Sequence, residues 1–365
     1  MHFASEGAAT VSVQSSENAP YKDGSPSGTG HAPMSRRRAF VWRAIAVLAA
    51  ILLVVVLALM WWWDHEPDTF AVVDRAQAHA ERHQHRLVPG TITTAALIEV
   101  AQTMLDKRGG YLSNDIAPPG LLMDNVPNWE YGVVVQIRDL ALALRNDLAR
   151  SQSQSVEDAD LRSAHDMFSQ SHARWLLPSS ESRYREGIAR TEAYLTRLGD
   201  NDDQNAQFYA RADNLAGYFD LVGKRLGSLS QRLSASVGQE RMNTDLAGDP
   251  NARQSTPTPD ERTVRTPWLQ VDDVFYEARG TTWALLHFLR AIEHDFEPVL
   301  RDKNALVSLR QVIRELEESQ VGLGSPIVLN GSPYGFFANH SLVMANYVSR
   351  ANAALIDLRK LLERG

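Results

Sequence analysis

The sequence predicts an all-α protein with one N-terminal transmembrane helix and an extramembrane helical bundle with coiled-coil-like packing. Twenty uncharged residues run from Ala44 to Trp63, enough to cross the hydrocarbon core of a bilayer as a helix. Behind them, apolar residues recur at alternating spacings of four and three, a pattern typical of helices packed at shallow angles. No stretch alternates cleanly between apolar and polar residues, so strands are not expected.

The N-terminal part divides into a tail and an anchor. Residues 1–35 are rich in Ser, Gly, Ala, Pro and Thr, and we expect a disordered cytoplasmic tail there. Residues 36–63 combine a basic flank with the transmembrane helix. The residues expected at the two membrane interfaces are Arg36, Arg37, Arg38 and Arg43 on one side and Trp61, Trp62 and Trp63 on the other.

A cleaved signal peptide is the main alternative to a retained anchor. The stretch before the apolar run is too long for an n-region, and no small-x-small cleavage site follows the run. Because positive charge stays on the cytoplasmic side, we expect a cytoplasmic N-terminus. Residues 64–365 would then form a helical periplasmic domain of a bacterial inner-membrane protein.

Composition excludes several function classes. The formal net charge is −7, and an acidic exterior domain without a basic stripe is a poor nucleic-acid binder. The chain has no cysteine, which excludes disulfides, thiol catalysis and thiolate metal sites. No pattern in the sequence implies a cofactor.

Three long helices follow from the apolar spacing, which is kept over residues 208–233, 274–296 and 344–361. Val133–Val135 could begin a strand, but the LALALRNDLAR stretch after it favours a helix. Shorter helices are expected over residues 94–107, 129–150, 157–175, 181–198 and 305–320.

Three irregular segments separate these helices. Residues 109–127 and 322–335 contain several Gly and Pro among apolar and aromatic residues, and we expect them to be packed. Residues 238–267 hold four prolines among polar residues and are the expected mobile linker.

Two groups of polar residues could hold a cation. His79 and His83 lie one helical turn apart, a usable zinc pair, but Glu81 points away from them and neighbouring arginines disfavour a cation. We expect a solvated stalk helix there and no metal site. Residues 200–203 begin like a calcium loop, but Asn205 and Arg211 occupy the positions that require Gly and Glu. An exposed turn before a helix that begins near Gln204 is expected instead.

Carboxylates that could catalyse are few. Glu293 and Glu297 lie one turn apart on a helix face that we expect to be solvated. Glu130, within PNWEYG, is the candidate for a general acid acting on a glycan, or else a first-turn acid favoured by the helix dipole. Ser332 lacks the spacing of a nucleophile elbow, and Gly322–Gly324 lacks the strand–helix context of a dinucleotide fingerprint.

Residues 332–346, SPYGFFANHSLVMAN, are dense in aromatic and amide side chains. They could form a partner surface, for which the candidates are Tyr334, Phe336, Phe337, Asn339, Trp129 and Tyr131. The alternative is that the loop packs on the bundle and that Asn339 or Ser341 caps the last helix.

Two phrases carry a family resemblance: PNWEYGVVVQIRDLALALRNDLARSQSQS and SPYGFFANHSLVMANYVSRANAALIDLR. They resemble the DUF2333 family of bacterial proteins, a domain family of unknown function. The resemblance extends over nearly everything from the anchor to the C-terminus and implies a proteobacterial envelope protein. It supplies no activity, cofactor or catalytic residue.

The leading functional hypothesis is therefore a non-enzymatic binding or scaffolding module of the envelope, held at the bilayer by one helix. Its expected partner is another envelope protein or a second copy, and Ala46 and Ala50 provide one small-xxx-small pair for helix association. One alternative is an envelope enzyme acting on glycan or peptide with Glu130 as the acid. Another is a periplasmic sensor, which would signal through a partner because the short tail has no room for an output domain.

Overall fold

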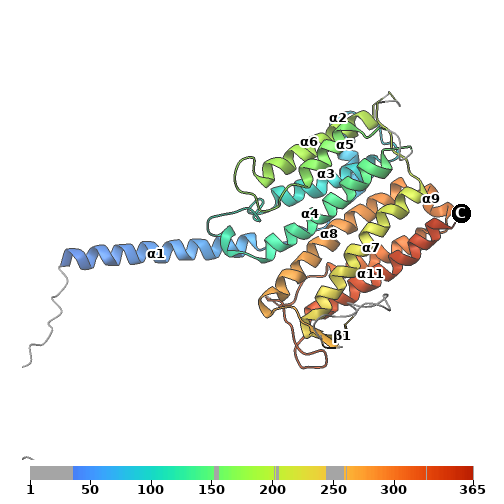
Figure 1. Ribbon diagram of the computed structural model, residues 1–365. Coiled ribbons are helices and arrows are strands. Elements are labelled where there is room, and N and C mark those ends of the chain that lie inside the picture. Colours follow the sequence, from blue (N-terminus) through green and yellow to red (C-terminus); the bar gives the residue numbers. More distant parts are fainter. Residues whose placement is uncertain are drawn as a thin grey trace, which may run out of the picture. The chain divides into compact units, whose positions relative to one another are not determined.

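The computed structural model describes residues 36–151, 156–200, 202, 205–243, 259, 261–325 and 327–364. The expected disordered tail, residues 1–35, lies outside the described residues, as do residues 244–258 of the expected linker. The chain divides into two compact units, Met1–Leu52 and Leu53–Gly365, and the second contains the last turns of the first helix and all later elements (Figure 1).

The fold is helical, as expected. Helix α1 (Arg36–Trp63) contains the apolar run, and its segment Phe40–Trp63 has a mean hydropathy of 3.0 and is long and apolar enough to span a membrane. None of its most apolar window is buried, so α1 is not a core helix of the domain. A signal sequence near the N-terminus can also be long and apolar enough to satisfy these two criteria.

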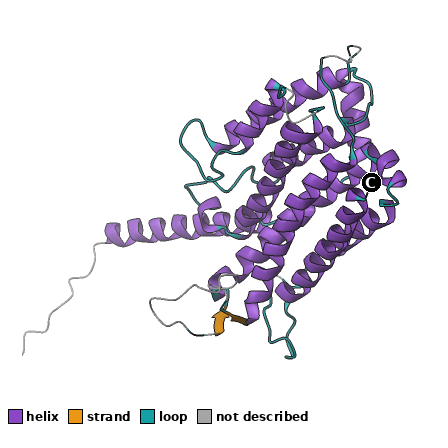
Figure 2. Cartoon of the chain, turned by 45° about the vertical axis from the view of Figure 1, so that its right-hand side comes forward, coloured by secondary structure: helices purple, strands orange, loops and turns teal. Residues whose placement is uncertain are grey.

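The domain behind α1 is built from helices that run along one another (Figure 2). The helices are α2 (Val72–His83), α3 (Thr91–Asp106), α4 (Asn125–Ala143), α5 (Ala159–Phe168), α6 (Ser180–Leu198), α7 (Ala212–Ser234), α8 (Val271–Asp295), α9 (Glu297–Asp302), α10 (Leu306–Ser319) and α11 (His340–Glu363). A π-helical turn, Leu144–Leu148, continues α4, and short 3-10 turns cover Gly120–Leu122, Ala235–Val237 and Trp268–Gln270.

Strands β1 (Gln239–Met242) and β2 (Glu261–Val264) pair antiparallel, with Gln239 opposite Val264. The expectation of a domain without strands is corrected at this point. The pair is short and half-exposed, and its backbone hydrogen bonds need no apolar alternation to form. It occupies both ends of the segment expected to be a mobile linker.

The predicted apolar seams form the interior. Helix α4 packs along α8, α7 packs along α11, and α10 contacts both α8 and α11. Val133–Val135 are part of α4, so the helical interpretation of that stretch is confirmed. In α11 the alternating spacing that begins at Met344 predicts Tyr347 and Ala354 in the apolar seam. The buried stripe runs instead through Val348 and Leu355, one residue further along, because this helix faces both α7 and α10.

Two predicted helix boundaries are wrong. Helix α7 begins at Ala212 and not near Gln204, because the Tyr209 amide donates to the Leu148 carbonyl at 2.7 Å and holds the preceding stretch extended. Phe208 nevertheless packs against the core, edge-on to Phe296. Helix α5 ends at Phe168 and not at residue 175, because Arg138 binds the Phe168 carbonyl at 2.7 Å and closes the helix end.

One end of the bundle lies next to the C-terminal end of α1, and we name it the proximal end. Met60 and Trp61 share a hollow with Leu122 and Asn125, at the start of α4. The start of α8 is tied to the start of α4 by the hydrogen bond of Asn128 to Asp273, at 2.7 Å. Ring contact between Phe275 and His340 places the start of α11 beside them. Trp63 and Trp175 line a common hollow, which places the loop before α6 there as well. The loops that precede α4, α6, α8 and α11 therefore meet at the proximal end.

Helices α4 and α8 approach each other backbone to backbone. A Cβ atom on Gly280 would lie 1.9 Å from the Trp129 carbonyl oxygen, and one on Gly132 would lie 2.2 Å from the Glu277 carbonyl oxygen. Only glycine permits this separation. The two central helices can therefore approach this closely only because Gly132 and Gly280 have no side chains.

The segment between α1 and α2 lies along α8. Glu66 pairs with Arg279, and the Phe70 amide donates to Nε2 of His287 at 3.0 Å. Nδ1 of His287 must then carry the hydrogen and donates to the Trp283 carbonyl at 2.7 Å. Both ring nitrogens are satisfied only in the neutral form, and burial, with a smaller contribution from Arg290, lowers the pKa of His287 to about 4.

We predict that Gly280→Ala lowers the free energy of unfolding by about 1–3 kcal/mol, or more, because the helices must separate to admit the methyl group. Gly217→Ala in α7 is the matched control, since nothing lies within 4 Å of the added atom. The control should stabilise the helix by up to about 1 kcal/mol. Urea unfolding of the full-length protein in detergent measures both, and equal stability of Gly280→Ala and the unchanged protein would contradict the backbone contact.

We also predict that the fold weakens as the pH falls from about 6.5 to about 4. In that range the unfolded imidazole binds a proton that the folded His287 does not, so stability is full above the range and declines within it. Over this pH range His287 should account for a loss of about 3 kcal/mol in the free energy of unfolding. His287→Gln should flatten the dependence of the unfolding free energy on pH, and an unchanged slope would show that this ring is not the neutral bridge described above.

Candidate functional site

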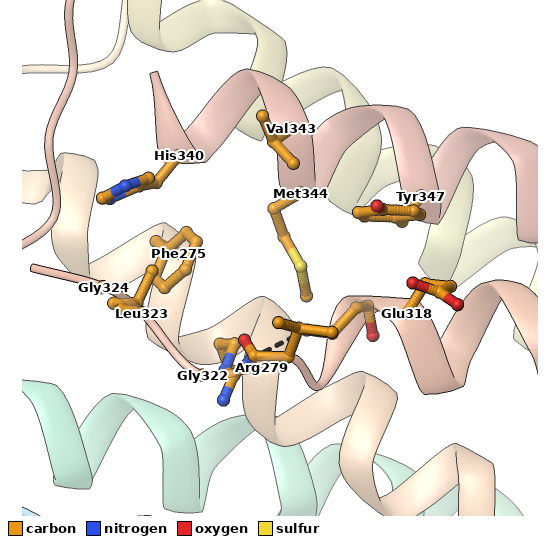
Figure 3. A pocket seen from close by; sticks show the side chains of 12 residues that line it. Phe275, Arg279, Glu318, Gly322, Leu323, Gly324, His340, Val343, Met344 and Tyr347 are labelled. Atoms are coloured by element: carbon orange, nitrogen blue, oxygen red, sulfur yellow. Dashed lines mark hydrogen bonds between the residues drawn. The ribbon is translucent and has the colours of Figure 1, made fainter. Parts of the chain in front are cut away.

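An open cleft lies at the proximal end between α8, α10 and α11 (Figure 3). Its volume is about 300 Å3, and the segment that follows α10, residues 321–324, forms one wall. Apolar side chains supply most of the lining, with Phe275 and Met344 facing each other across it and Leu323 and Val343 beside them. Such a lining suits an apolar side chain or a short apolar segment.

Arg279 is the buried cation at the base of the cleft and is only 7% exposed. Its Nε lies 3.0 Å from Oε2 of Glu66, and its Nη1 donates to the Ser319 and Val321 carbonyls at 2.8 and 2.9 Å. The guanidinium group thereby closes the C-terminal end of α10 and fixes the wall of the cleft. These contacts occupy Arg279 in holding the structure together.

His340 and Glu318, two further polar groups of the cleft, are also engaged. Nδ1 of His340 accepts from the Leu329 amide at 3.0 Å, and partial burial lowers the pKa of this imidazole. Glu318 lies 3.5 Å from Arg314. Among the described residues, the cleft lining holds no nucleophile paired with a base.

The loop of residues 332–338 projects three aromatic side chains into solvent. Tyr334 is 102% exposed, Phe336 98% and Phe337 71%. The base of the loop is fixed, because the Gly331 amide donates to the Ala338 carbonyl at 3.0 Å and Asn339 donates to the Gly331 carbonyl at 2.6 Å. No charged residue occurs between Gln320 and Asn339.

This geometry combines parts of both sequence-based interpretations. Asn339 caps α11 by accepting from the Leu342 amide at 2.8 Å, as the packed-loop alternative expected of it, and Ser341 does not act as the cap. The aromatic side chains, however, do not pack on the bundle. We name Tyr334, Phe336 and Phe337 the aromatic tip.

Two other candidates for the partner surface lie elsewhere. Trp129 is fully buried against Trp283, because its helix face meets α8 at the glycine crossing, so its assignment to a partner surface is corrected. Tyr131 is half-buried beside His172, with ring centroids 4.8 Å apart. Neither residue lines the cleft.

Glu130 is wholly buried in a closed polar site. Its carboxylate pairs with the ammonium group of Lys107, whose side chain is only 2% exposed. It also accepts from the Leu112 and Ser113 amides, both at 2.8 Å, and from the Ser113 hydroxyl at 2.5 Å. Solvent does not reach this carboxylate.

The position of Glu130 therefore contradicts both hypotheses made from the sequence, a general acid and a first-turn acid. A general acid must reach the leaving group of a glycan, and this carboxylate is enclosed and fully hydrogen-bonded. It is not a first-turn acid either, since α4 begins at Asn125 and Glu130 lies in the second turn. Its role is to fasten the loop after α3 onto α4.

The histidines near the start of the domain do not lie on a solvated stalk, and that expectation is corrected. Helix α2 buries Val72, Ala76 and Ala80 against the bundle, and His79 is 2% exposed. Nδ1 of His79 lies 3.1 Å from Nε2 of His85, and burial together with the neighbouring histidines lowers the pKa of His79 to about 4.

The second member of the predicted zinc pair, His83, is exposed and stacks on the His79 ring at 4.4 Å. Within the described part of the chain, no group of three His, Asp or Glu side chains is placed to hold a metal ion. Glu293 binds Arg310 at 2.6 Å, and Glu297 binds Arg301 at 2.9 Å, so each acid has an arginine partner.

The expected interfacial residues lie along α1. The side chains of Arg36 and Arg37 are outside the described part, whereas those of Arg38 and Arg43 are exposed. Trp61 is 79% and Trp62 51% exposed, and the Arg108 guanidinium lies 4.4 Å from the Trp62 ring centroid. The Trp63 ring packs on Gly109, where a Cβ atom would lie 2.7 Å away and φ is +83°.

These observations define a class of protein: a helical domain behind one apolar helix, with an open apolar cleft and an exposed aromatic tip. Within that class, the chain belongs to the DUF2333 family, described as an uncharacterized protein conserved in bacteria, whose family model matches residues 35–365. The resemblance inferred from the two phrases is thereby confirmed. No curated protein and no solved structure matches the chain.

We predict that Glu130→Gln destabilises the fold by about 3–5 kcal/mol, because it leaves the Lys107 ammonium group buried without a counter-charge. The double variant Lys107→Met with Glu130→Gln should recover most of this loss. Urea unfolding of the single and double variants measures the difference. A glycan-cleaving activity that disappears in a stably folded Glu130→Gln protein would contradict the structural role.

Proposed function

We propose that the protein is a membrane-anchored binding module of the bacterial envelope, with its N-terminus in the cytoplasm and its helical domain in the periplasm. The aromatic tip and the neighbouring cleft would take an apolar segment of another envelope protein. The observation that carries this proposal is the exposure of Tyr334, Phe336 and Phe337 on an uncharged loop with a fixed base.

The anchor is supported by the length and hydropathy of α1 and by its connection to the domain. Removal of α1 by a signal peptidase would also remove Trp63, whose ring packs on Gly109. The orientation is supported by charge, because Arg36–Arg38 and Arg43 precede the apolar run whereas Asp64, Glu66 and Asp68 follow it.

Binding is supported by the cost of exposing aromatic surface. The free energy of a Phe side chain is about 1.5–3 kcal/mol higher in water than in a protein interior. Clusters of exposed apolar residues therefore mark interaction sites. Because the base of the loop is held by the Gly331 and Asn339 hydrogen bonds, little conformational entropy would be lost when a partner covers the tip. Aromatic residues at the centre of an interface commonly supply most of its affinity.

The cleft would provide the second contact. Arg279 ties its wall to α10, and the uncharged stretch 320–339 connects this wall directly to the aromatic tip. An apolar partner segment could therefore contact both without meeting an exposed charge between them along that stretch. This arrangement favours a hydrophobic peptide-like ligand over a charged small molecule.

We predict that a photo-crosslinking amino acid at Phe336, in the full-length protein in intact cells, forms an adduct with one envelope protein. Crosslinking from Val307, which is 77% exposed at the other end of the bundle, is the control and should not capture it. Met344→Arg should reduce the Phe336 adduct several-fold, because it puts a charge into the cleft. Capture of lipid alone, of the protein itself alone or of a cytosolic protein would each overturn the proposal.

A further inference from the structure

Exposed apolar side chains gather on two proximal-end loops that the partner proposal does not use. The loop between α3 and α4 exposes Ile116, Leu121 and Leu122 by 57–60%, and the loop between α5 and α6 exposes Trp175, Leu176 and Leu177 by 53–86%. We name these six residues the rim. Six large apolar side chains in water at one end of a domain require an explanation.

The rim is continuous with the end of the apolar helix. One hollow is lined by Met60 and Trp61 together with Leu122 and Met123. A second hollow is lined by Trp63 together with Ile116 and Trp175. The tryptophans expected at the membrane interface and the rim residues thus form one continuous surface within the unit Leu53–Gly365.

The two rim loops are held in place by hydrogen bonds. The Tyr111 hydroxyl donates to the His172 carbonyl at 2.8 Å, and the Asn114 side chain donates to the Arg174 carbonyl at 3.3 Å. The first loop is fastened to α4 by Glu130 through the Leu112 and Ser113 amides. Their apolar side chains are therefore presented outward by a supported backbone.

Charge within the two rim loops is sparse, and carboxylates border them: Asp64 and Asp124 line the first hollow, and Asp115 and Glu181 line the second. Residues 108–123 carry only Arg108 and Asp115, and residues 171–178 carry only Arg174. Arg108 already lies over the Trp62 ring, the arrangement that an indole and a cation adopt at the headgroup level. Burial raises the pKa of Asp115, and Lys107 opposes this shift.

From this continuity we propose that the rim lies in the headgroup layer of the bilayer that holds α1, so that the domain rests on the membrane surface and does not hang from a free tether. The inference rests on the proposed anchor. A lipid surface is favoured over a second copy because the rim shares its hollows with the end of the very helix that enters the bilayer. The bilayer would cover the rim and Trp61 together.

The test uses the absence of native cysteine, which allows single spin labels in the full-length chain. Leu121→Cys and Leu176→Cys report on the rim, where the leucines are 59% and 57% exposed. Leu87→Cys, 48% exposed at the far end of the domain, is the matched control, and Val54→Cys in α1 reports on the anchor. The labelled proteins are reconstituted in vesicles of phosphatidylethanolamine and phosphatidylglycerol.

We expect the ratio of collisions with oxygen to collisions with a water-soluble nickel complex to be several-fold higher at Leu121 and Leu176 than at Leu87. Val54 should give a higher ratio still. A low oxygen-to-nickel ratio at Leu121 and Leu176, as in water, together with a high ratio at Val54, as in lipid, would overturn the rim proposal. The proposed anchor would still hold. A low ratio at Val54, as in water, would overturn both the rim proposal and the proposed membrane anchor. Dipolar broadening between rim labels, removed by dilution with unlabelled protein, would assign the rim to a second copy and also overturn the proposal.

Discussion

Helices α4 and α8 cross backbone to backbone at Gly132 and Gly280, where a Cβ atom on either glycine would collide with the other helix. Because no side chain separates the two backbones, each helix fixes the position of the other at this crossing. The residues that flank the crossing are fixed with it: Glu130 on α4 faces the loop that carries part of the rim, and Arg279 on α8 lies at the base of the cleft. One helix contact therefore positions both surfaces at the proximal end.

Two buried charged side chains, one on each of these helices, fix the neighbouring loops in place. Glu130, paired with Lys107, holds the loop after α3, and Arg279, paired with Glu66, holds the segment after α1 and the end of α10. Buried ion pairs add little net stability, because desolvation offsets the Coulomb attraction. Their effect here is positional, since each fixes irregular backbone that has few apolar side chains of its own in the core.

Much of the fold could be predicted from the sequence. The apolar run of α1 and the stripes of α7, α8 and α11 depend on periodicity within one helix, which the sequence displays directly. The start of α7 could not be predicted, because it depends on the Tyr209 amide meeting the Leu148 carbonyl from a distant helix. The strand pair depends likewise on backbone hydrogen bonds between two polar segments.

The candidate sites were harder to predict because burial decides their roles. Asn339 as a helix cap follows from a local rule, and Glu130 has no local signal that separates an exposed acid from an enclosed one. His79 was expected in solvent because its neighbours are charged, yet α2 packs through small residues that periodicity weighs lightly. Lys107 and Arg279 were missed because their partners lie 23 and 213 residues away.

The two proposals together give the proximal end of the helical domain two different environments. The rim would lie against lipid, and the aromatic tip and cleft would remain available to a protein. Neutron reflectometry of the full-length protein in a supported bilayer tests the central claim directly. The account predicts that protein density begins within the headgroup layer and continues into the domain without a gap. A layer of bulk water between the headgroups and the domain would contradict it.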